Sequence, residues 1–510
     1  MNTFMNRMKQ VNNITRTENG GISRKTTESA VLDLFSLGGA YRNRTDSDVI
    51  LLFKNAYEEE PLLALKCLFY LRDRSEGQGE RRFFRVAYRW LCNNYPTVAM
   101  KNLEQVPEFG RWDDLIYATE GTPVEVGAFN LIKWQLELDK VCKTPSLLAK
   151  WMPSQNASNQ ETKRLGYKLA NYLCMTSKEY RKMLSSLRER IKVLERLMSS
   201  NQWDKIEFDK IPSRAGIIYR NAFAHKEVTA ARYAAFMNNK TTKVNAGVLY
   251  PNDIAHRAFD WKMQIKGLND PERAALDKYW SCLPDYYQGK EENAIAVVDV
   301  SGSMNGTPME AAVSLGAYVA DKSHGPFANH FITFSSKPEF VKFEGVDIVD
   351  KFNRCKSADW GQNTNLEAVF DMLLTIARNE NVKAADIPRR LYILSDMEFD
   401  QCVSFNANYN NNDNRSYLRY WSAPTVNSEE EVNSDLEKIA MKWRQFGYEL
   451  PEVIFWNLNA RHDRIPAIGG RFSYISGFSP SILQQVLSGK TGYELCLEKL
   501  MSDRYKAIKI

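Results

Sequence analysis

The sequence predicts a multidomain protein in which an all-α N-terminal array precedes a C-terminal α/β domain with a doubly wound, mostly parallel sheet. Residues 30–289 carry apolar side chains at helical spacing and almost no strand signal. Residues 290–510 instead alternate strand-like apolar runs with helix-like segments. Residues 1–29 are polar, so we expect them to form a flexible N-terminal segment.

The helical part, residues 30–289, is divided into short stretches by Gly, Pro and Asn. Helices of one to four turns joined by short loops favour a stacked array of helical repeats. No clean repeat period is present, so a compact helical domain remains the alternative. The clearest helical stretches are residues 61–71, 80–92, 131–141, 163–174 and 178–198.

The C-terminal part, residues 290–510, reads as strands and helices in alternation, which implies a parallel sheet covered on both faces. Residues 401–430 are rich in Asn and poor in apolar side chains, which predicts a loop insertion. The expected strands lie at residues 294–298, 328–334, 339–343, 391–395, 452–457 and 471–475, and the expected helices at 308–323, 366–378, 432–446 and from Pro480 onward.

Polar side chains follow two of these strands. In Asp299-Val-Ser301-Gly-Ser303, an acid and two hydroxyls stand at alternate positions directly after a buried strand. Asp396 ends a second strand, and Thr364 precedes a helix, where Thr is also a common N-cap. Because ligands bind beyond the carboxyl ends of parallel strands, the hard oxygen donors of Asp299, Ser301 and Ser303 predict a magnesium site at that edge. A single Asp at the end of a strand is, by itself, more often a loop residue than a ligand.

This arrangement resembles the metal-ion-dependent adhesion site (MIDAS) of von Willebrand factor A (vWA) domains, which takes a Thr from a second loop and an Asp from a third. Adhesion domains usually have Gly after that Asp, whereas Met397 and Glu398 follow here, so the role of Glu398 stays open. The resemblance implies that one Mg²⁺, or another divalent cation such as Mn²⁺, is surrounded by Asp299, Ser301, Ser303, Thr364 and Asp396.

Charge is unevenly distributed along the chain. Residues 293–510 hold 23 basic and 27 acidic residues, whereas residues 161–245 alone hold 18 basic and 8 acidic ones. A basic face attracts phosphate backbones, although a merely solvated face is the alternative. The side chains that we expect to bind RNA are Arg181, Lys182, Arg188, Lys192, Arg214 and Arg220.

A second basic segment is Leu71-Arg-Asp-Arg-Ser-Glu-Gly-Gln-Gly-Glu-Arg81, between two helical stretches. Its arginines could clamp a phosphate, but ion pairs between helices are slightly favoured. This segment, Ala149-Lys-Trp-Met-Pro-Ser154 and the A-type domain that follows resemble the Ro-like family: the Ro ribonucleoprotein autoantigen with its TROVE module, and its uncharacterised plant, viral and phage relatives. The likeness is greater to the uncharacterised branch.

The resemblance implies a ring of HEAT-like helical repeats that binds small structured or misfolded non-coding RNA away from the metal site. The other function to consider is a protein-interaction module in which a partner carboxylate completes the metal. Enzyme signatures are weak, so we expect no enzyme: Ser488-Gly-Lys-Thr491 follows a helix rather than a strand, and the five histidines are dispersed.

The composition of the chain indicates the cellular compartment in which we expect the protein. No apolar run approaches the roughly 20 residues of a membrane helix, so no membrane partner is expected. The eight cysteines include no C-x-x-C pair and are expected to be reduced thiols of a cytoplasmic protein.

Overall fold

The computed structural model divides into an α/β unit and a helical unit, which we describe separately. The α/β unit comprises residues 1–28, 290–343 and 355–474, and the helical unit comprises residues 29–289, 344–354 and 475–510. The expected insertion at residues 401–430 lies outside the described residues. The structure describes residues 8–9, 12–260, 264–335, 337–356, 364–400, 435–467 and 471–510.

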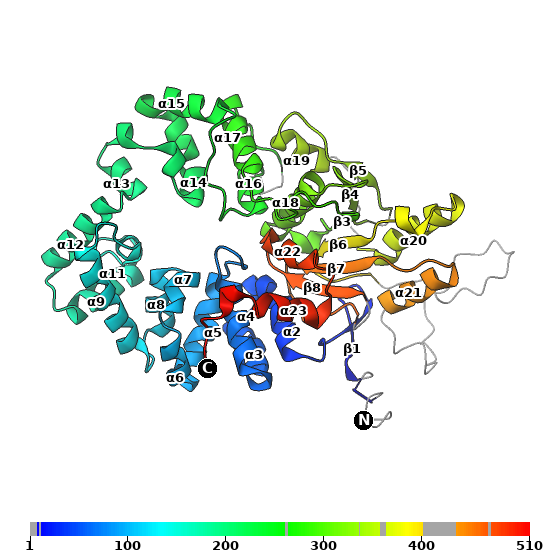
Figure 1. Ribbon diagram of the computed structural model, residues 1–510, viewed down its shortest axis with the longest axis horizontal. Coiled ribbons are helices and arrows are strands. Elements are labelled where there is room, and N and C mark those ends of the chain that lie inside the picture. The colour runs from blue at the N-terminus through cyan, green and yellow to red at the C-terminus, as the bar shows by residue number, and fades with distance from the viewer. Residues whose placement is uncertain are drawn as a thin grey trace. The chain divides into compact units, whose positions relative to one another are not determined.

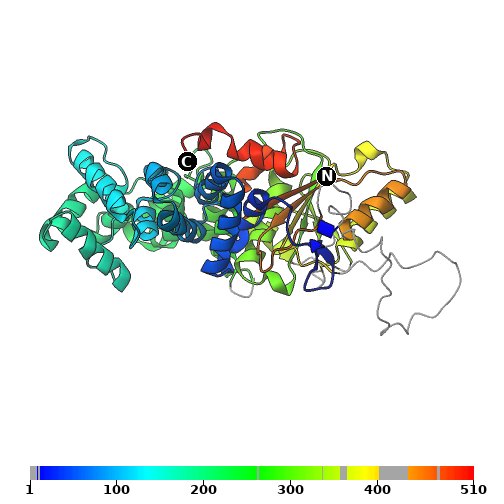
Figure 2. The same ribbon diagram turned by 90° about the horizontal axis from the view of Figure 1, so that it is seen from below.

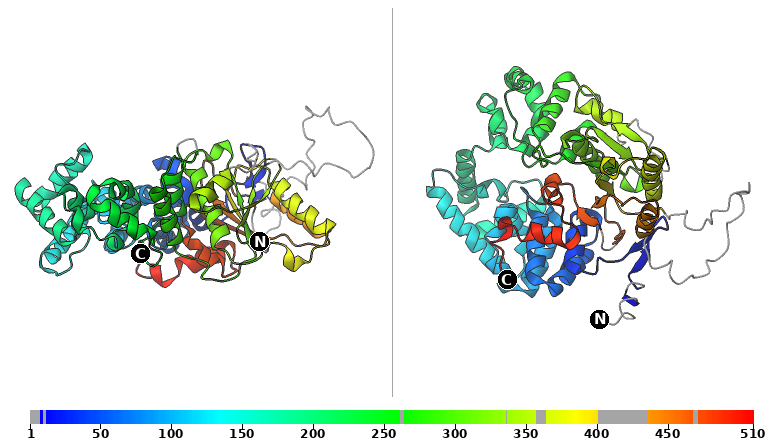
Figure 3. Two further views of the ribbon diagram at one scale, coloured as in Figure 1. Left: turned by 90° about the horizontal axis from the view of Figure 1, so that it is seen from above. Right: turned by 45° about the vertical axis from the view of Figure 1, so that its right-hand side comes forward.

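The helical unit consists of helices that follow one another through space largely in chain order (Figures 1 and 3). They confirm the prediction of a helical N-terminal region. The helices are α2 (Ala30–Leu37), α3 (Asp46–Glu59), α4 (Pro61–Arg72), α5 (Arg81–Asn94), α6 (Pro96–Lys101), α7 (Gln105–Phe109), α8 (Trp112–Thr119), α9 (Glu125–Val141), α10 (Leu148–Trp151), α11 (Gln160–Tyr172), α12 (Ser177–Arg190), α13 (Leu194–Ser199), α14 (Ser213–His225), α15 (Glu227–Asn238), α16 (Pro251–Ala258), α17 (Asp270–Ser281), α19 (Ile348–Lys356), α22 (Leu483–Val486) and α23 (Gly492–Leu500).

One helix differs from its prediction. The single helix expected over residues 178–198 is wrong, because α12 ends at Arg190 and α13 begins at Leu194. Lys192 adopts a left-handed conformation with φ of 49°, and the backbone N–H of Val193 donates to the carbonyl of Arg188. This bond closes the end of α12 in the manner of a Schellman cap. Lys192 therefore leaves the face that it was expected to share with Arg181 and Arg188.

The start of α12 offers a first stability prediction. The Thr176 hydroxyl accepts from the N–H of Glu179, and the Glu179 carboxylate accepts in return from the N–H of Thr176 at 2.8 Å. Loss of such a cap costs about 1 kcal/mol. Thr176→Ala should therefore increase the hydrogen exchange of the first-turn amides of α12 about fivefold, whereas Ser177→Ala should not. Equal exchange in both variants would contradict a capping role for Thr176.

The α/β unit is built on a six-stranded sheet of order β5-β4-β3-β6-β7-β8. Strands β3, β4, β6 and β7 run parallel, and β5 runs antiparallel at one edge, which confirms an α/β domain with a mostly parallel sheet. Its elements are β3 (Ala294–Val298), α18 (Thr307–Lys322), β4 (His330–Thr333), β5 (Phe340–Lys342), α20 (Leu366–Asn379), β6 (Arg390–Ser395), α21 (Asp435–Gln445), β7 (Glu452–Asn457) and β8 (Phe472–Ser476).

The three central strands β3, β6 and β7 are buried along their whole length, as expected of strands covered on both faces. Helix α18 packs closely on β3 and β6; a Cβ added at Gly316 would lie 2.4 Å from Val298 Cγ2, so this position requires glycine. Helices α20 and α21 lie side by side in the same unit (Figures 1 and 2). Because β3, β6 and β7 are parallel neighbours, the loops that follow them meet at one edge of the sheet.

The segment expected to be flexible contains a hairpin. Strand β1 (Ile14–Arg16) pairs antiparallel with β2 (Ile22–Arg24), and the turn between them is formed by Thr17 to Gly21. The hairpin belongs to the α/β unit, where the Arg24 guanidinium lies 3.0 Å from the Glu437 carboxylate. Within the described residues, no helix combines the length and the apolar character needed to cross a bilayer.

Candidate functional site

The loop after β3 holds the first three predicted metal ligands. Asp299 is fully buried, and its carboxylate accepts from the N–H of Ser301 at 2.8 Å and from the Ser395 hydroxyl at 2.6 Å. The hydroxyls of Ser301 and Ser303 lie 2.9 Å apart. The Asp-x-Ser-x-Ser loop therefore gathers one carboxylate and two hydroxyls in a small space.

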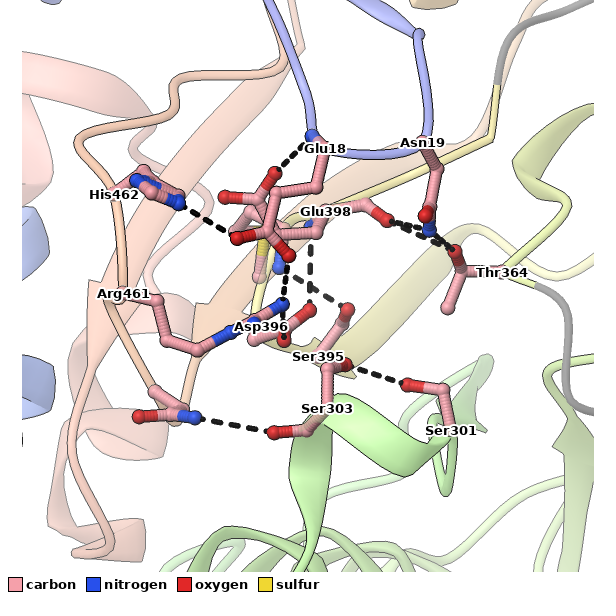
Figure 4. A network of polar contacts seen from close by, with 12 residues as sticks. Glu18, Asn19, Ser301, Ser303, Thr364, Ser395, Asp396, Glu398, Arg461 and His462 are labelled. Atoms are coloured by element: carbon pink, nitrogen blue, oxygen red, sulfur yellow. Dashed lines mark hydrogen bonds and ion pairs between the residues drawn. The ribbon is translucent and has the colours of Figure 1, made fainter.

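The loop after β6 supplies the other predicted acid. Asp396 is fully buried, and its Oδ1 accepts from the N–H of Glu398 at 3.2 Å. Thr364 donates its hydroxyl to the carbonyl of Glu398 at 2.9 Å, and this side chain is 1% exposed. Figure 4 shows Ser301, Ser303, Thr364 and Asp396 together in one polar network. The three loops that were expected to meet do so.

Electrostatics at this edge favour a cation. Burial, followed by the charge of Asp396, raises the pKa of Asp299 to about 7. Burial also raises the pKa of Glu398, which is 1% exposed. Oδ2 of Asp396 accepts no hydrogen bond from the described residues, although it lies 3.4 Å from Nη2 of Arg461. Closely spaced buried acids with an unused oxygen are suited to a hard divalent ion that accepts carboxylate, hydroxyl and water oxygens.

The predicted metal site contains few carboxylates. Among the described residues, no group of three or more His, Cys, Asp and Glu side chains is placed to hold a metal ion. The cluster instead combines two aspartates with Ser and Thr hydroxyls, which is the composition that the sequence predicted. Those side chains fit a Mg²⁺-like ion whose remaining positions are filled by water or by an external ligand.

Sequence reasoning missed four residues at this edge. Ser395 bonds to Asp299, Arg461 lies beside Asp396, and Glu18 and Asn19 contact the loop after β6. Ser395 and Arg461 follow from strand order, because β6 ends beside β3 and β7 ends beside β6. Glu18 and Asn19 could not be found this way, since they lie about 380 residues from Glu398 in the chain.

The helical unit contains a large basic cavity of about 1130 Å³. Nine lysine and arginine side chains line it, against one acidic side chain, Glu195. We call it the basic cavity and define it by the following lining residues: Arg72, Arg74, Arg81, Arg111, Lys150, Trp151, Ser154, Tyr180, Arg181, Arg188, Arg196, Arg214, Tyr219 and Tyr250.

The two segments that carry the Ro-like resemblance converge on the basic cavity: residues 71–81 contribute Arg74 and Arg81, and residues 149–154 contribute Trp151. Burial and then the charge of Arg72 lower the pKa of Arg74, and burial and then the charge of Arg111 lower that of Arg81. Positive charge is thus only partly compensated there, and a bound anion would relieve the repulsion.

Two other arginines of the cavity, Arg72 and Arg111, stabilise the fold. Arg72 is 3% exposed and lies 2.7 Å from the fully buried Asp114, and the Arg111 guanidinium stacks 3.9 Å from the centre of the Trp151 ring. The segment at residues 71–81 therefore forms an ion pair between helices through Arg72, and it presents Arg74 and Arg81 to the cavity.

The six residues expected to bind RNA separate into three groups. Arg181, Arg188 and Arg214 line the basic cavity, and Arg188 also donates to the carbonyls of residues 149 and 152. Arg220 is a core side chain that is 7% exposed and donates to the carbonyl of residue 217. The remaining two are exposed but lie outside the cavity lining, namely Lys182 and Lys192.

The chain is similar to proteins of unassigned role along most of its length. A family profile described as "Domain of unknown function (DUF2828)" matches residues 17–117 and 135–285, and a second, "Domain of unknown function (DUF7788)", matches residues 293–505. The chain is 28% identical over 522 residues to "Uncharacterized protein L728" of Acanthamoeba polyphaga mimivirus, a match that covers 94% of this chain and 85% of the viral protein. The helical and α/β parts therefore occur together in a viral relative.

Proposed function

We propose that this chain is a Ro-like RNA-binding protein whose HEAT-like helical unit binds small structured or misfolded RNA in the basic cavity. The observation that carries the proposal is the lining of that cavity, where nine basic side chains from separate segments meet one acid. Arginine and lysine bind phosphate oxygens, and an aromatic side chain such as Trp151 can stack on a base.

The test is RNA binding by the purified full-length chain as a function of salt. Each phosphate neutralised on a single strand contributes about 0.7 to the slope of log affinity against log salt. We expect a slope of magnitude about 3 or more, the same for RNAs of different sequence, in filter-binding assays from 50 to 300 mM KCl. Affinity that does not change with salt would rule out a phosphate-binding cavity.

We propose in addition that the α/β unit is a vWA-type domain with a MIDAS-type site for Mg²⁺ or Mn²⁺. In this proposal the metal site does not bind the RNA. Asp299→Ala should leave RNA affinity within about twofold of the wild type, because the basic cavity is built entirely from the helical unit. The same filter-binding assay checks this expectation. Loss of RNA binding by a folded Asp299→Ala protein would place RNA at the metal site instead.

A second function is supported by the residues beside the acids. Arg461 and Arg464 follow β7 and lie near Asp396 and Glu398, with Arg461 Nη2 3.4 Å from the Asp396 carboxylate. An arginine next to a metal site can orient an incoming carboxylate. We therefore also propose that the α/β unit binds a protein partner whose acidic side chain completes the metal.

A further inference from the structure

The N-terminal hairpin is docked on the loop that follows β6. Thr17 donates its hydroxyl to the carbonyl of Phe399 at 2.5 Å and accepts from the N–H of Gly21 at 2.8 Å. A Cβ added at Gly21 would lie 2.7 Å from that same carbonyl, so glycine permits the close approach. Gly20 also pairs with Asp400 in an antiparallel bridge. These contacts fix the position of the hairpin turn.

The tip of the turn, Glu18 and Asn19, bonds directly to the loops of the metal site (Figure 4). The N–H of Glu18 donates to the Glu398 carboxylate at 2.7 Å. The Asn19 side-chain amide donates to the carbonyl of Glu398 at 2.7 Å and to the Thr364 hydroxyl at 3.0 Å. The tip thus contacts Thr364, a predicted ligand, and Glu398, which lies two positions after the predicted ligand Asp396.

The carboxylate of Glu18 is held by the loop after β7. Oε2 lies 2.6 Å from Nη2 of Arg461, and Oε1 lies 2.7 Å from Nε2 of His462. The same Arg461 nitrogen lies 3.4 Å from the Asp396 carboxylate, so one guanidinium joins Glu18 to a predicted ligand. Glu18 is therefore a fourth acid beside Asp299, Asp396 and Glu398.

The presence of the Glu18 carboxylate beside other acids has to be explained, because like charges at short range repel each other. Arg461, which holds the Glu18 carboxylate, is also one of the two arginines that would orient an external carboxylate at the metal. We propose that residues 17–21 are a tethered occupant of the ligand position, in which Glu18 stands in for the acidic side chain of a protein partner. A partner acid then binds by displacing this tip. The inference rests on the metal site and on the second function proposed above.

The experiment uses the full-length chain and a fluorescent peptide that copies residues 14–24. We expect the double variant Glu18→Gln/Asn19→Ala to bind this peptide at least tenfold more tightly than the wild type does, in Mn²⁺ but not in EDTA. A peptide with Gln in place of Glu18 should bind neither protein. Glu28→Gln, an exposed acid of the same segment, is the matched control and should behave like the wild type.

Mn²⁺ titration of the same proteins separates the two proposals. If no protein binds Mn²⁺, the metal site is wrong and the tethered-occupant proposal falls with it. If wild type and double variant bind Mn²⁺ but bind the peptide equally, or not at all, only the tethered occupant is overturned. Should the double variant lose its fold, the single variant Glu18→Gln, which preserves the shape of the side chain, gives the same comparison.

Discussion

Replacing Arg74 and Arg81 together by glutamate should weaken RNA binding by about a hundredfold or more. Both side chains line the basic cavity, and neither forms an ion pair with a carboxylate of the described residues. A hydrogen bond to a charged group contributes about 1.5–3 kcal/mol, so the loss of two corresponds to roughly two to four powers of ten in affinity. Filter binding at 100 mM KCl measures the change.

The matched control is Lys182→Glu/Lys192→Glu. It changes the net charge by the same amount, within the same unit, on exposed side chains outside the cavity lining. The control should reduce affinity only by the smaller, screened effect of distant charge. If both double variants lose affinity equally, RNA is attracted by overall charge and the cavity is not its site.

Asp299→Asn should abolish stabilisation by Mg²⁺ or Mn²⁺. A ligand that binds only the folded state raises the unfolding free energy by about 2.7 kcal/mol at a hundred times its dissociation constant. The substitution also removes one of three closely spaced buried carboxyl groups, so in EDTA the variant should be at least as stable as the wild type. Thermal unfolding with and without 5 mM MnCl₂ tests both expectations.

A control for this substitution is Asp386→Asn, an exposed acid-to-amide change in the same unit. It should retain the full metal-dependent shift. A shift of wild-type size in Asp299→Asn would contradict the metal assignment, since the Asp299 carboxylate is central to the predicted ligand set. Stability in EDTA far below that of the wild type would show that Asp299 is needed for folding rather than for metal.

The strands and the predicted ligands of the α/β unit could be found from the sequence because they depend on local patterns. Buried parallel strands appear as uninterrupted apolar runs, and the residues after them must lie at one edge of the sheet. Once Asp299 and Asp396 are each assigned to a strand end, their proximity follows from the topology alone. The strand β7, expected at residues 452–457, has those bounds in the structure.

Contacts between distant segments could not be predicted. The polar residues 1–29 give no periodic signal, and nothing in the sequence around Glu18 indicates a partner at Glu398. The end of α12 was missed because Lys192, which lacks the usual glycine signal, adopts the left-handed conformation. Arg220 was expected on a surface, but its place in the core depends on how α14 packs against its neighbours.

The hairpin gives the α/β unit an unusual order of assembly during translation. Glu18 leaves the ribosome before its partner His462, which is 444 residues later in the chain. At about 5–20 residues per second, roughly 20 to 90 s pass before the two can meet. The helical segment at residues 29–289 is synthesised within that interval and can fold first. The nascent N-terminal strand pair must therefore remain soluble without its sheet, which suits its polar composition.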